Sequence, residues 1–383
     1  MNRVRTLGYT VLGGAFALLV ARTFFFGLYY VDSPSMEPGL HGAPKGGDYV
    51  IVRYGDGKDL KRFDTVVLVP KGETEPFVKR VAALPGESVV IRGGNLWIDD
   101  SILRSDALES NTVVVFDDQL SDLERAFRLG DVWSESVEGW RLDASSVDVG
   151  ANAGLMYMRL GLKDHHYVRS SEFTRGVENV ADGILEFQVE VVSPSFLLRF
   201  GMNEQGDSFE VSIEAGAGPS TQLTLSRMNS SRPETLAETN VYFPRGERSL
   251  RFSNVNDRLS VWIDGTMVVD ELYDGNVLLA SDLAKTGMSR PSDRVFLGGS
   301  AGVGLFSGIR VLRDIHYTPR GTYAKGAAVQ LGPHQIFVLG DNSRDSEDGR
   351  DWGPIDLDSV LGRVIGIAWP PERMRTFPSG TGD

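Results

Sequence analysis

Apolar and polar positions alternate with a period of two along much of this 383-residue chain, which is the pattern of β-strands with one buried face. Glycine, proline and aspartate separate the alternating segments, and Asp99-Asp100 stands where a hairpin turn is expected. Outside the middle of the chain, the pattern predicts strands within residues 48–54, 64–70, 76–84, 87–103, 334–343 and 360–370.

The middle of the chain shows the same alternation and few segments of helical periodicity. Between residues 258 and 264, apolar residues alternate with polar ones and tryptophan, and Asp264-Gly265 supplies a hairpin turn of the primed type. Further strands are predicted within residues 184–192, 195–202, 208–215, 221–227, 248–255, 258–272, 294–300 and 308–318. Strands at this spacing, with turn residues throughout, predict an antiparallel β-sandwich.

We therefore expect an all-β fold in which the sandwich is inserted into a second, discontinuous β domain. The expected boundaries place the inserted sandwich at residues 105–320. The outer β domain then consists of residues 31–104 and 321–375, and residues 376–383 form a C-terminal tail.

The N-terminal segment has a different composition. Arg3 and Arg5 precede an uncharged run over residues 7–21, and with the aromatic residues that follow the run reaches the roughly 20 residues needed to span a bilayer. We expect a single transmembrane helix at residues 1–30, with a cytoplasmic N-terminus and the rest of the chain outside the cell membrane. The alternative is a cleavable secretory signal, since "AFA" at 15–17 has small residues at cleavage spacing.

Charge and cysteine content exclude several function classes. The net charge of −13 argues against a nucleic-acid partner, because phosphate binding needs a basic patch. The absence of cysteine excludes a disulfide framework, a thiol nucleophile and cysteine-ligated zinc. The aspartate-rich segment 340–355 superficially suggests calcium, but it lacks the regular ligand spacing of a calcium loop. We expect no metal and no cofactor.

Two short stretches carry residues that fit nucleophilic catalysis. In "VDSPSMEPGL", residues 31–40, prolines on either side of Ser35 stiffen the loop and can aim a hydroxyl, although a plain polar linker would look similar. In "PFVKRVAALPGE", Lys79 shares a strand face with apolar residues. A lysine held among apolar neighbours loses solvation and can act as a base near neutral pH, whereas an edge-strand lysine would only guard against strand pairing.

Together with "FVLGDNSRDSEDGRDWG", these stretches resemble the conserved boxes of the bacterial type I signal peptidases, the membrane-anchored serine/lysine proteases. The boxes occur in the family's order behind an N-terminal anchor, and the resemblance covers about residues 1–104 and 321–373. It implies that Ser35 is the nucleophile and Lys79 the general base. It also implies that the hydroxyl of Ser33 and the backbone N–H of Ser35 form the oxyanion hole.

The resemblance further implies that Ser346 orients the lysine ammonium and that Asp348 and Arg350 form a supporting ion pair. The supporting positions of the same boxes also include Arg80, Asp341 and Asn342. The chain departs from the family at Pro34 and Gly349, where Gly and Ser are usual, and at Phe63, where glycine is common. None of these departures removes a group that carries a proton or charge in the mechanism.

The implied activity is a signal-peptide endopeptidase that cleaves exported preproteins after small residues, at Ala-x-Ala sites, through an acyl-enzyme. Its partners are then signal-peptide-bearing preproteins and membrane lipid. A Ser-His-Asp triad is the competing interpretation for the chemistry, but His41 lies only six residues from Ser35, and His165, His166 and His316 belong to the insert. No G-x-S-x-G elbow surrounds the serine.

The insert supports a second hypothesis from a different class. It resembles concanavalin-like and laminin-G-like sandwiches, especially in "RLSVWIDGTMVV", and such modules often bind sugars or proteins. The chain could then be a membrane-tethered binding module on a peptidase-derived platform. Trp133, Trp140 and Trp262 could stack on sugars, or they could be buried core residues. A cytosolic self-cleaving repressor of the serine/lysine type is a third idea, and the N-terminal span argues against it.

Overall fold

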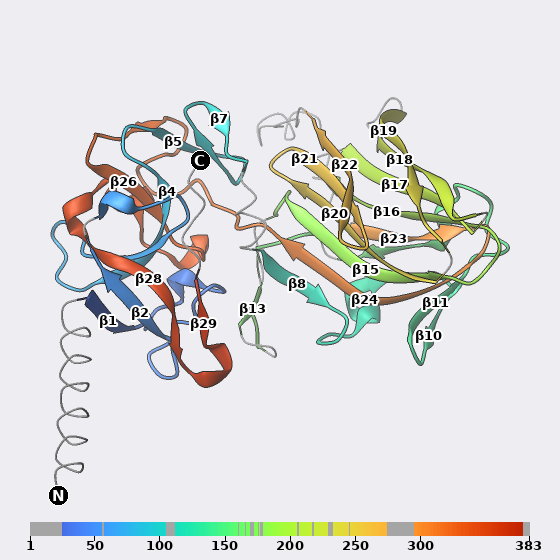
Figure 1. Ribbon diagram of the computed structural model, residues 1–383, viewed down its shortest axis with the longest axis horizontal. Helices are drawn as coiled ribbons and strands as arrows, with labels where there is room; N and C mark the ends of the chain where they lie inside the picture. Colours follow the sequence, from blue (N-terminus) through green and yellow to red (C-terminus); the bar gives the residue numbers. More distant parts are fainter. Residues whose placement is uncertain are drawn as a thin grey trace, which may run out of the picture. The chain divides into compact units, whose positions relative to one another are not determined.

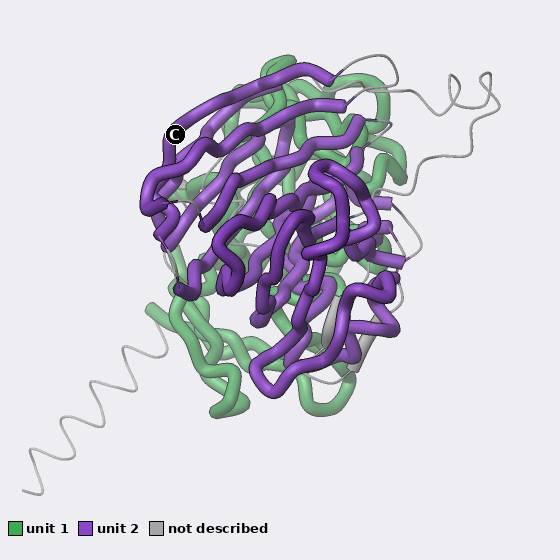
Figure 2. The backbone as a smooth tube through the Cα atoms, turned by 90° about the vertical axis from the view of Figure 1, so that its right-hand side faces the viewer, with its two compact units in different colours: residues 1–111, 317–383 green, residues 112–316 purple. Residues whose placement is uncertain are grey.

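The computed structural model describes residues 25–377 except residues 56, 105–111, 160, 165, 169–171, 175, 177–178, 205–206, 217, 229–232, 245 and 274–294. The chain forms two compact units, one of residues 1–111 and 317–383 and the other of residues 112–316 (Figure 2). After the resemblances described above, we call the first the peptidase unit and the second the insert unit. The boundaries expected from the sequence, residues 105–320, are a few residues wider at each end.

The predicted anchor needs a correction at its end. Residues 1–24 lie outside the described residues, but β1 (Phe26–Tyr30) is a strand and not the end of a helix. It pairs antiparallel with β2 (Tyr49–Tyr54), so its backbone groups are satisfied by a neighbouring strand, and its aromatic residues favour that geometry. Within the part of the chain that the structure describes, no helix is long and apolar enough to cross a membrane.

The peptidase unit is built on one large antiparallel sheet whose strands come from both ends of the chain (Figure 1). Its order is β1, β2, β28 (Val360–Trp369), β3 (Thr65–Leu68), β4 (Phe77–Ala83), β26 (Gln335–Leu339) and β27 (Ile355–Asp356), with β29 (Arg375–Thr376) beside β28. A smaller sheet has the order β25 (Val329–Gln330), β5 (Ser88–Arg92), β6 (Asn95–Ile98) and β7 (Ser101–Ile102).

Apolar side chains cover both faces of the large sheet. Successive residues of a strand point to opposite faces, and the neighbours Val66 and Val67 on β3 belong to two different buried clusters. Val67 packs with Val50 and Val52, whereas Val66 packs with residues of β4 and β26 such as Val338. β3 and β4 are therefore buried central strands, which suits them to hold a side chain in one position.

The insert unit is an antiparallel β-sandwich. One sheet has the order β10 (Trp133–Ser136), β11 (Gly139–Asp143), β24 (Val303–Arg313), β15 (Gly183–Val191), β20 (Glu247–Val255), β21 (Arg258–Ile263) and β22 (Thr266–Leu272), with β8 (Val113–Asp117) also on β24. The other has the order β19 (Pro233–Tyr242), β18 (Ser220–Met228), β17 (Asp207–Ala215), β16 (Phe196–Glu204), β23 (Val295–Ser300), β12 (Leu155–Met158) and β9 (Phe127–Arg128). β13 (His166–Val168) and β14 (Glu172–Thr174) form a separate two-stranded sheet.

A single buried cluster fills the space between these two sheets. Phe200 of one sheet packs against Phe187 and Phe252 of the other, with ring centroids 5.2 and 6.3 Å apart. The predictions of an all-β fold and of a sandwich in the middle of the chain are confirmed by this arrangement.

Both predicted hairpin turns are present as well. Asp264 and Gly265 have φ angles of 50° and 75°, and Asp99 and Asp100 have φ angles of 50° and 60°. Positive φ at both central residues is what a type I′ turn requires, and aspartate and glycine tolerate it.

The helices that the structure describes are all single turns. They are η1 (Pro34–Met36), η2 (Gly57–Asp59), α3 (Leu123–Ala126), η3 (Asn152–Gly154), η4 (Ser343–Asp345), α5 (Gly349–Trp352), η5 (Leu357–Ser359) and η6 (Pro371–Arg373). Three of them, η1, η4 and α5, carry or adjoin most of the residues that the sequence singled out.

Candidate active site

Ser35 lies in the single turn η1, which is held in place from both sides. Pro34 opens the turn, where its fixed φ suits a helix start, and Ser33 before it is extended. Asn342 donates from its backbone N–H to the Ser35 carbonyl at 3.0 Å and from its side chain to the Pro34 carbonyl at 3.1 Å. The loop after β26 therefore fixes the backbone on which the Ser35 hydroxyl stands.

Lys79 lies on β4 and points at that hydroxyl. Its Nζ donates a hydrogen bond of 2.9 Å to Ser35 Oγ, and the lysine is 1% exposed. The ammonium lies 5.7 Å from the ring centre of Phe77 and 5.9 Å from that of Trp352. Burial lowers the pKa of Lys79 to about 8, against the opposing charges of Asp348 and others. The structure thus joins the two residues that sequence resemblance implied as nucleophile and base.

Arg80, the next residue on β4, forms a buried ion pair. Its Nε and Nη2 donate to the two carboxylate oxygens of Asp341, each at 2.6 Å, and its Nη1 donates to the Phe63 carbonyl at 2.9 Å. Phe63 has a φ of 68°, which is strained for a residue with a side chain. The left-handed backbone gives a physical reason why glycine is common at that position in the resembling family.

Asp348 and Arg350 form a second buried pair, and both are fully buried. Arg350 donates from Nε at 2.8 Å and from Nη2 at 2.7 Å to the Asp348 carboxylate, which also accepts from the Gly340 backbone at 2.9 Å. Burial alone would raise the pKa of Asp348, but the hydrogen bonds and charge of Arg350 hold it below its usual value. The pair is therefore a charged scaffold at the start of α5.

The two remaining serines differ in their contacts. Ser33 is exposed, and its Oγ donates to Ser35 Oγ at 3.4 Å. Ser346 is 1% exposed, and its Oγ has no hydrogen-bond partner among the described residues. The orienting contact to the Lys79 ammonium is not made in this structure, and the role of Ser346 stays a prediction.

His41 pairs with Glu37, whereas a catalytic triad would require it to hydrogen-bond to the Ser35 hydroxyl. Its Nδ1 pairs with Glu37 Oε1 at 2.6 Å, and both side chains are buried. Ser35 Oγ accepts hydrogen bonds from Lys79 and Ser33 instead. In this structure Lys79, and not His41, therefore contacts the Ser35 hydroxyl.

Two buried carboxylates of the aspartate-rich loop are paired with arginines. Asp341 is bound by Arg80 and Asp348 by Arg350, as described above. Among the described residues, no group of three or more His, Cys, Asp or Glu side chains is arranged to hold a metal ion.

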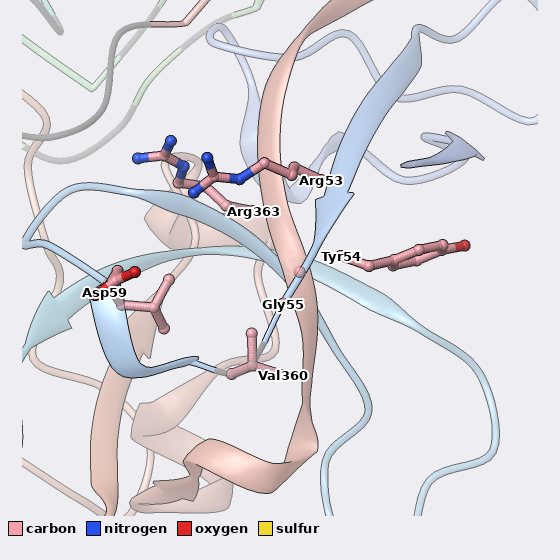
Figure 3. A pocket seen from close by; sticks show the side chains of 8 residues that line it. Arg53, Tyr54, Gly55, Asp59, Val360 and Arg363 are labelled. Carbon is pink, nitrogen blue, oxygen red and sulfur yellow. The ribbon is translucent and has the colours of Figure 1, made fainter. Parts of the chain in front are cut away.

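A pocket of about 260 Å³ lies elsewhere on the peptidase unit, beside β2, β28 and η2 (Figure 3). Its lining includes Arg53 and Arg363, whose guanidinium groups lie side by side in the figure, and Asp59. None of the predicted site residues lines it. The pocket is therefore not the cleft in which Ser35 would meet a substrate.

The tryptophans of the insert unit do not form a single sugar-stacking surface. Trp133 is 8% exposed and packs on Phe306 with ring centroids 5.1 Å apart, so it is a core residue. Trp140 packs partly buried against the same core, and Trp262 lies under the guanidinium of Arg251 at 5.2 Å. β10 and β11 lie at one end of their sheet and β21 near the other.

Sequence reasoning missed the partners that surround Arg350. Arg350 also donates from Nη1 to the backbone carbonyl of Thr318 at 3.0 Å and to the Ser343 hydroxyl, and from Nη2 to the Ser343 carbonyl at 2.8 Å. Arg320 donates to the Ser346 carbonyl. Thr318 and Arg320 had been assigned to the insert, because no local pattern distinguishes them from its last turn.

Comparison with known proteins agrees with the resemblance. The family described as "Signal peptidase, peptidase S26" matches residues 4–131 and 311–369. Signal peptidase I of Bacillus amyloliquefaciens is 36% identical over 108 residues, which are 26% of this chain and 56% of that protein. Signal peptidase I of Bacillus licheniformis is 32% identical over 101 residues, 26% of this chain and 53% of that protein.

The chain thus spans about half the length of these curated relatives. Within that limit, the matches confirm the similarity to bacterial type I signal peptidases that the boxes indicate, and they support the prediction of a serine endopeptidase.

Similarity to solved structures is weak. The CBM2 module of the evolved Dit protein of Lactobacillus casei BL23 phage J-1 is 12% identical, covers 54% of this chain and 99% of that chain, and has a TM-score of 0.36. The carbohydrate-binding module CBM66 from Bacillus subtilis is 10% identical, covers 48% of this chain and 93% of that chain, and has a TM-score of 0.30. Similarity at this level carries no argument about a ligand of the insert unit.

Proposed function

We propose that this relative of the type I signal peptidases is a membrane-anchored serine endopeptidase that removes signal peptides from exported preproteins. The observation that carries the proposal is the 2.9 Å hydrogen bond from Lys79 Nζ to Ser35 Oγ in a buried setting. A serine hydroxyl is a weak nucleophile until a base within hydrogen-bond reach removes its proton, and a desolvated lysine can be that base without histidine.

The reaction proceeds in two halves. Ser35 Oγ attacks the scissile carbonyl carbon while Lys79 takes the hydroxyl proton, and the carbonyl oxygen becomes an oxyanion stabilised by the Ser35 N–H and the Ser33 hydroxyl. The C–N bond then breaks, Lys79 returns the proton to the leaving amine, and an ester joins the signal peptide to Ser35. Water then attacks that ester while Lys79 accepts one of its protons, and the bond between the acyl carbon and Ser35 Oγ breaks. Lys79 returns the proton to Ser35 Oγ, so the peptide leaves as a carboxylic acid and the serine hydroxyl is restored.

Substrate class and location follow from the same family resemblance. We propose small side chains at the −1 and −3 positions of the cleavage site, as in Ala-x-Ala. We also propose a single N-terminal membrane anchor that precedes β1, with a cytoplasmic N-terminus and both units outside the cell membrane. Membrane lipid and signal-peptide-bearing preproteins are then the partners.

The insert unit has a separate proposed role as a binding module for a glycan or a protein. It has a continuous core of its own, and none of the residues placed around Ser35 and Lys79 comes from residues 112–316. A module that folds around its own core can be added to an enzyme without rebuilding the active site.

Cleavage of a model preprotein tests the proposed function. The purified full-length chain in detergent is incubated with a preprotein carrying one Ala-x-Ala site, and the product masses locate the cut. We expect cleavage directly after the second alanine, no cleavage by Ser35→Ala, and normal cleavage by Ser101→Ala, which removes an exposed serine from β7. Uncleaved preprotein with wild-type protein, or equal cleavage by Ser35→Ala, would reject the proposal.

A further inference from the structure

The first residues of the peptidase unit after the insert lie against the loop that contains Ser346 and Asp348. We call residues 317–323 the exit segment. Thr318 accepts two hydrogen bonds from Arg350 Nη1, at 3.0 Å on its carbonyl and 3.1 Å on its hydroxyl. The backbone N–H groups of Thr322 and Tyr323 donate to the Arg350 carbonyl at 2.7 and 2.9 Å. Arg350 is thus held by the exit segment at both its backbone and its side chain.

Arg320 contacts Ser346 directly. Its Nη2 donates to the Ser346 carbonyl, while its buried Nε has no partner among the described residues. A buried donor without a hydrogen-bond partner costs free energy, so this arrangement is not the most stable one available to an arginine. Departures of this kind from the most stable arrangement are expected where a residue serves function.

The exit segment also approaches the loop too closely for a side chain at one position. Gly321 has a φ of 79°, and a Cβ added there would lie 2.4 Å from the Arg350 carbonyl oxygen. Gly326 has nearly the same backbone, with a φ of 81°, but a Cβ there would meet nothing within 4 Å. Glycine at 321 is therefore required by contact with the loop, and glycine at 326 only by the turn.

The loop held in this way is connected to Lys79 through its neighbours, because Asn342 of the loop donates to the Ser35 carbonyl and Trp352, on α5, lies 5.9 Å from the lysine ammonium. The charges that act on Lys79 are those of Asp341, Glu347, Asp348 and Arg350, all on the loop or α5. The Ser35 hydroxyl and the rings of Phe77 and Trp352 complete its surroundings. Desolvation is the main effect on the lysine, so its basicity depends on how tightly this loop excludes water.

We propose that the exit segment is a positioning element for the active site. In it, Arg320 and Gly321 hold loop 341–350 against Lys79, so that water is excluded from the lysine ammonium. The residues act through Ser346 and Arg350 and contact no reacting atom. The effect on catalysis rests on the proposed function. The effect on the titration of Lys79 does not, because it can be measured without a substrate. It assigns a task to residues at which the chain leaves the insert and re-enters the peptidase unit.

The two glycines provide a matched test. In Gly321→Ala and Gly326→Ala, the Lys79 titration is followed by NMR of the lysine side-chain ε-carbon in the full-length protein in detergent. We expect Gly321→Ala to raise the midpoint by one pH unit or more, because a displaced loop admits water, and Gly326→Ala to leave it unchanged. At pH 7 the neutral fraction of Lys79 should then fall about tenfold, and kcat with it, while KM changes little.

A second pair remains informative if Gly321→Ala does not fold. Arg320→Met should raise the Lys79 midpoint, Arg320→Lys should restore it in part, and Arg344→Met, which removes an exposed charge from the same loop, should not move it. Unchanged midpoints in both Gly321→Ala and Arg320→Met would overturn the inference, as would equal shifts in the controls. Failure of the proposed function has a different signature: the wild-type protein would cut no preprotein whatever the Lys79 midpoint.

Discussion

Lys79 Nζ lies 2.9 Å from Ser35 Oγ, and no ion pair among the described residues involves this lysine. The two aspartates whose charges act most strongly on it are each bound by an arginine, Asp341 by Arg80 and Asp348 by Arg350. The carboxylates that would otherwise stabilise the ammonium are thus largely neutralised, and burial decides the basicity of Lys79.

Burying an ammonium in this way should reduce stability, and Lys79→Met should show it. Since the Lys79 pKa drops from its usual value near 10.5 to about 8 on folding, the unfolded chain holds the proton more tightly between these two values. Wild-type stability should therefore rise with pH from about 8 to 10.5, relative to Lys79→Met. At pH 7 the inactive variant should be more stable by about 3 kcal/mol. Denaturant unfolding at pH 7 and pH 10.5 measures this, and a pH-independent difference would contradict the account.

Ser33→Ala should slow the reaction without weakening substrate binding. Ser33 is exposed beside the nucleophile, with its Oγ 3.4 Å from Ser35 Oγ, and we assign its hydroxyl to the oxyanion. Loss of one oxyanion donor costs about 100 to 1000-fold in kcat. Steady-state kinetics on a peptide substrate provide the measurement, and Ser33→Thr, which keeps a hydroxyl, should retain more activity than Ser33→Ala. A normal kcat in Ser33→Ala would remove Ser33 from the mechanism.

The Arg80–Asp341 pair should be costly to break from one side. Both residues are buried, and their two 2.6 Å hydrogen bonds compensate the charges. Arg80→Met leaves an unpaired buried carboxylate and should destabilise the peptidase unit by about 3–5 kcal/mol. Arg92→Met removes the exposed partner of Asp100 in the same unit and should cost at most about 1 kcal/mol. The free energy of unfolding is measured with denaturant. Equal losses of stability in the two variants would show that the buried pair stabilises the unit no more than the exposed one.

The boundary of a viable truncation should depend on the exit segment. Replacing residues 112–316 by a Gly/Ser linker keeps Thr318 and Arg320 and should leave a folded enzyme that cuts a small peptide, since halving a loop changes its closure entropy by only about 0.6 kcal/mol. Replacing residues 106–320, close to the boundaries expected from the sequence, removes both residues. This chain should turn over the peptide at least tenfold more slowly than the chain that lacks only residues 112–316. Equal activity of the two truncated chains would count against the exit segment. Loss of activity in both would show that the insert unit completes the catalytic core.

Local patterns in the sequence predicted much of the fold. Alternation located β2, β4 and the sandwich strands, and Asp264-Gly265 marked its turn, because each of these features depends on residues close together in the chain. The resemblance supplied Ser35 and Lys79, which are 44 positions apart. No pattern could supply the pairing of Arg80 with Asp341, since 261 positions separate them.

Two elements were misassigned from the sequence, because local patterns do not reveal contacts between distant residues. The aromatic residues of β1 suit a membrane interface and a strand equally well, so composition alone extended the predicted anchor too far. The exit segment looked like the last turn of the insert, because its function lies in contacts to Ser346 and Arg350 that only the folded chain brings together. The role that the resemblance implies for Ser346 is not one of these errors and stays a prediction.

The pH dependence of preprotein cleavage tests the serine/lysine assignment most directly. The full-length protein should cut with a kcat/KM that rises with pH through an apparent pKa near 8, the value to which burial lowers the pKa of Lys79, because only the neutral amine can accept the Ser35 proton. Ser35→Ala, Lys79→Met and the double variant should all be inactive to the same extent, since nucleophile and base act as a unit. Near-normal cleavage by Lys79→Met, or a profile that disappears when His41 is replaced, would contradict the assignment.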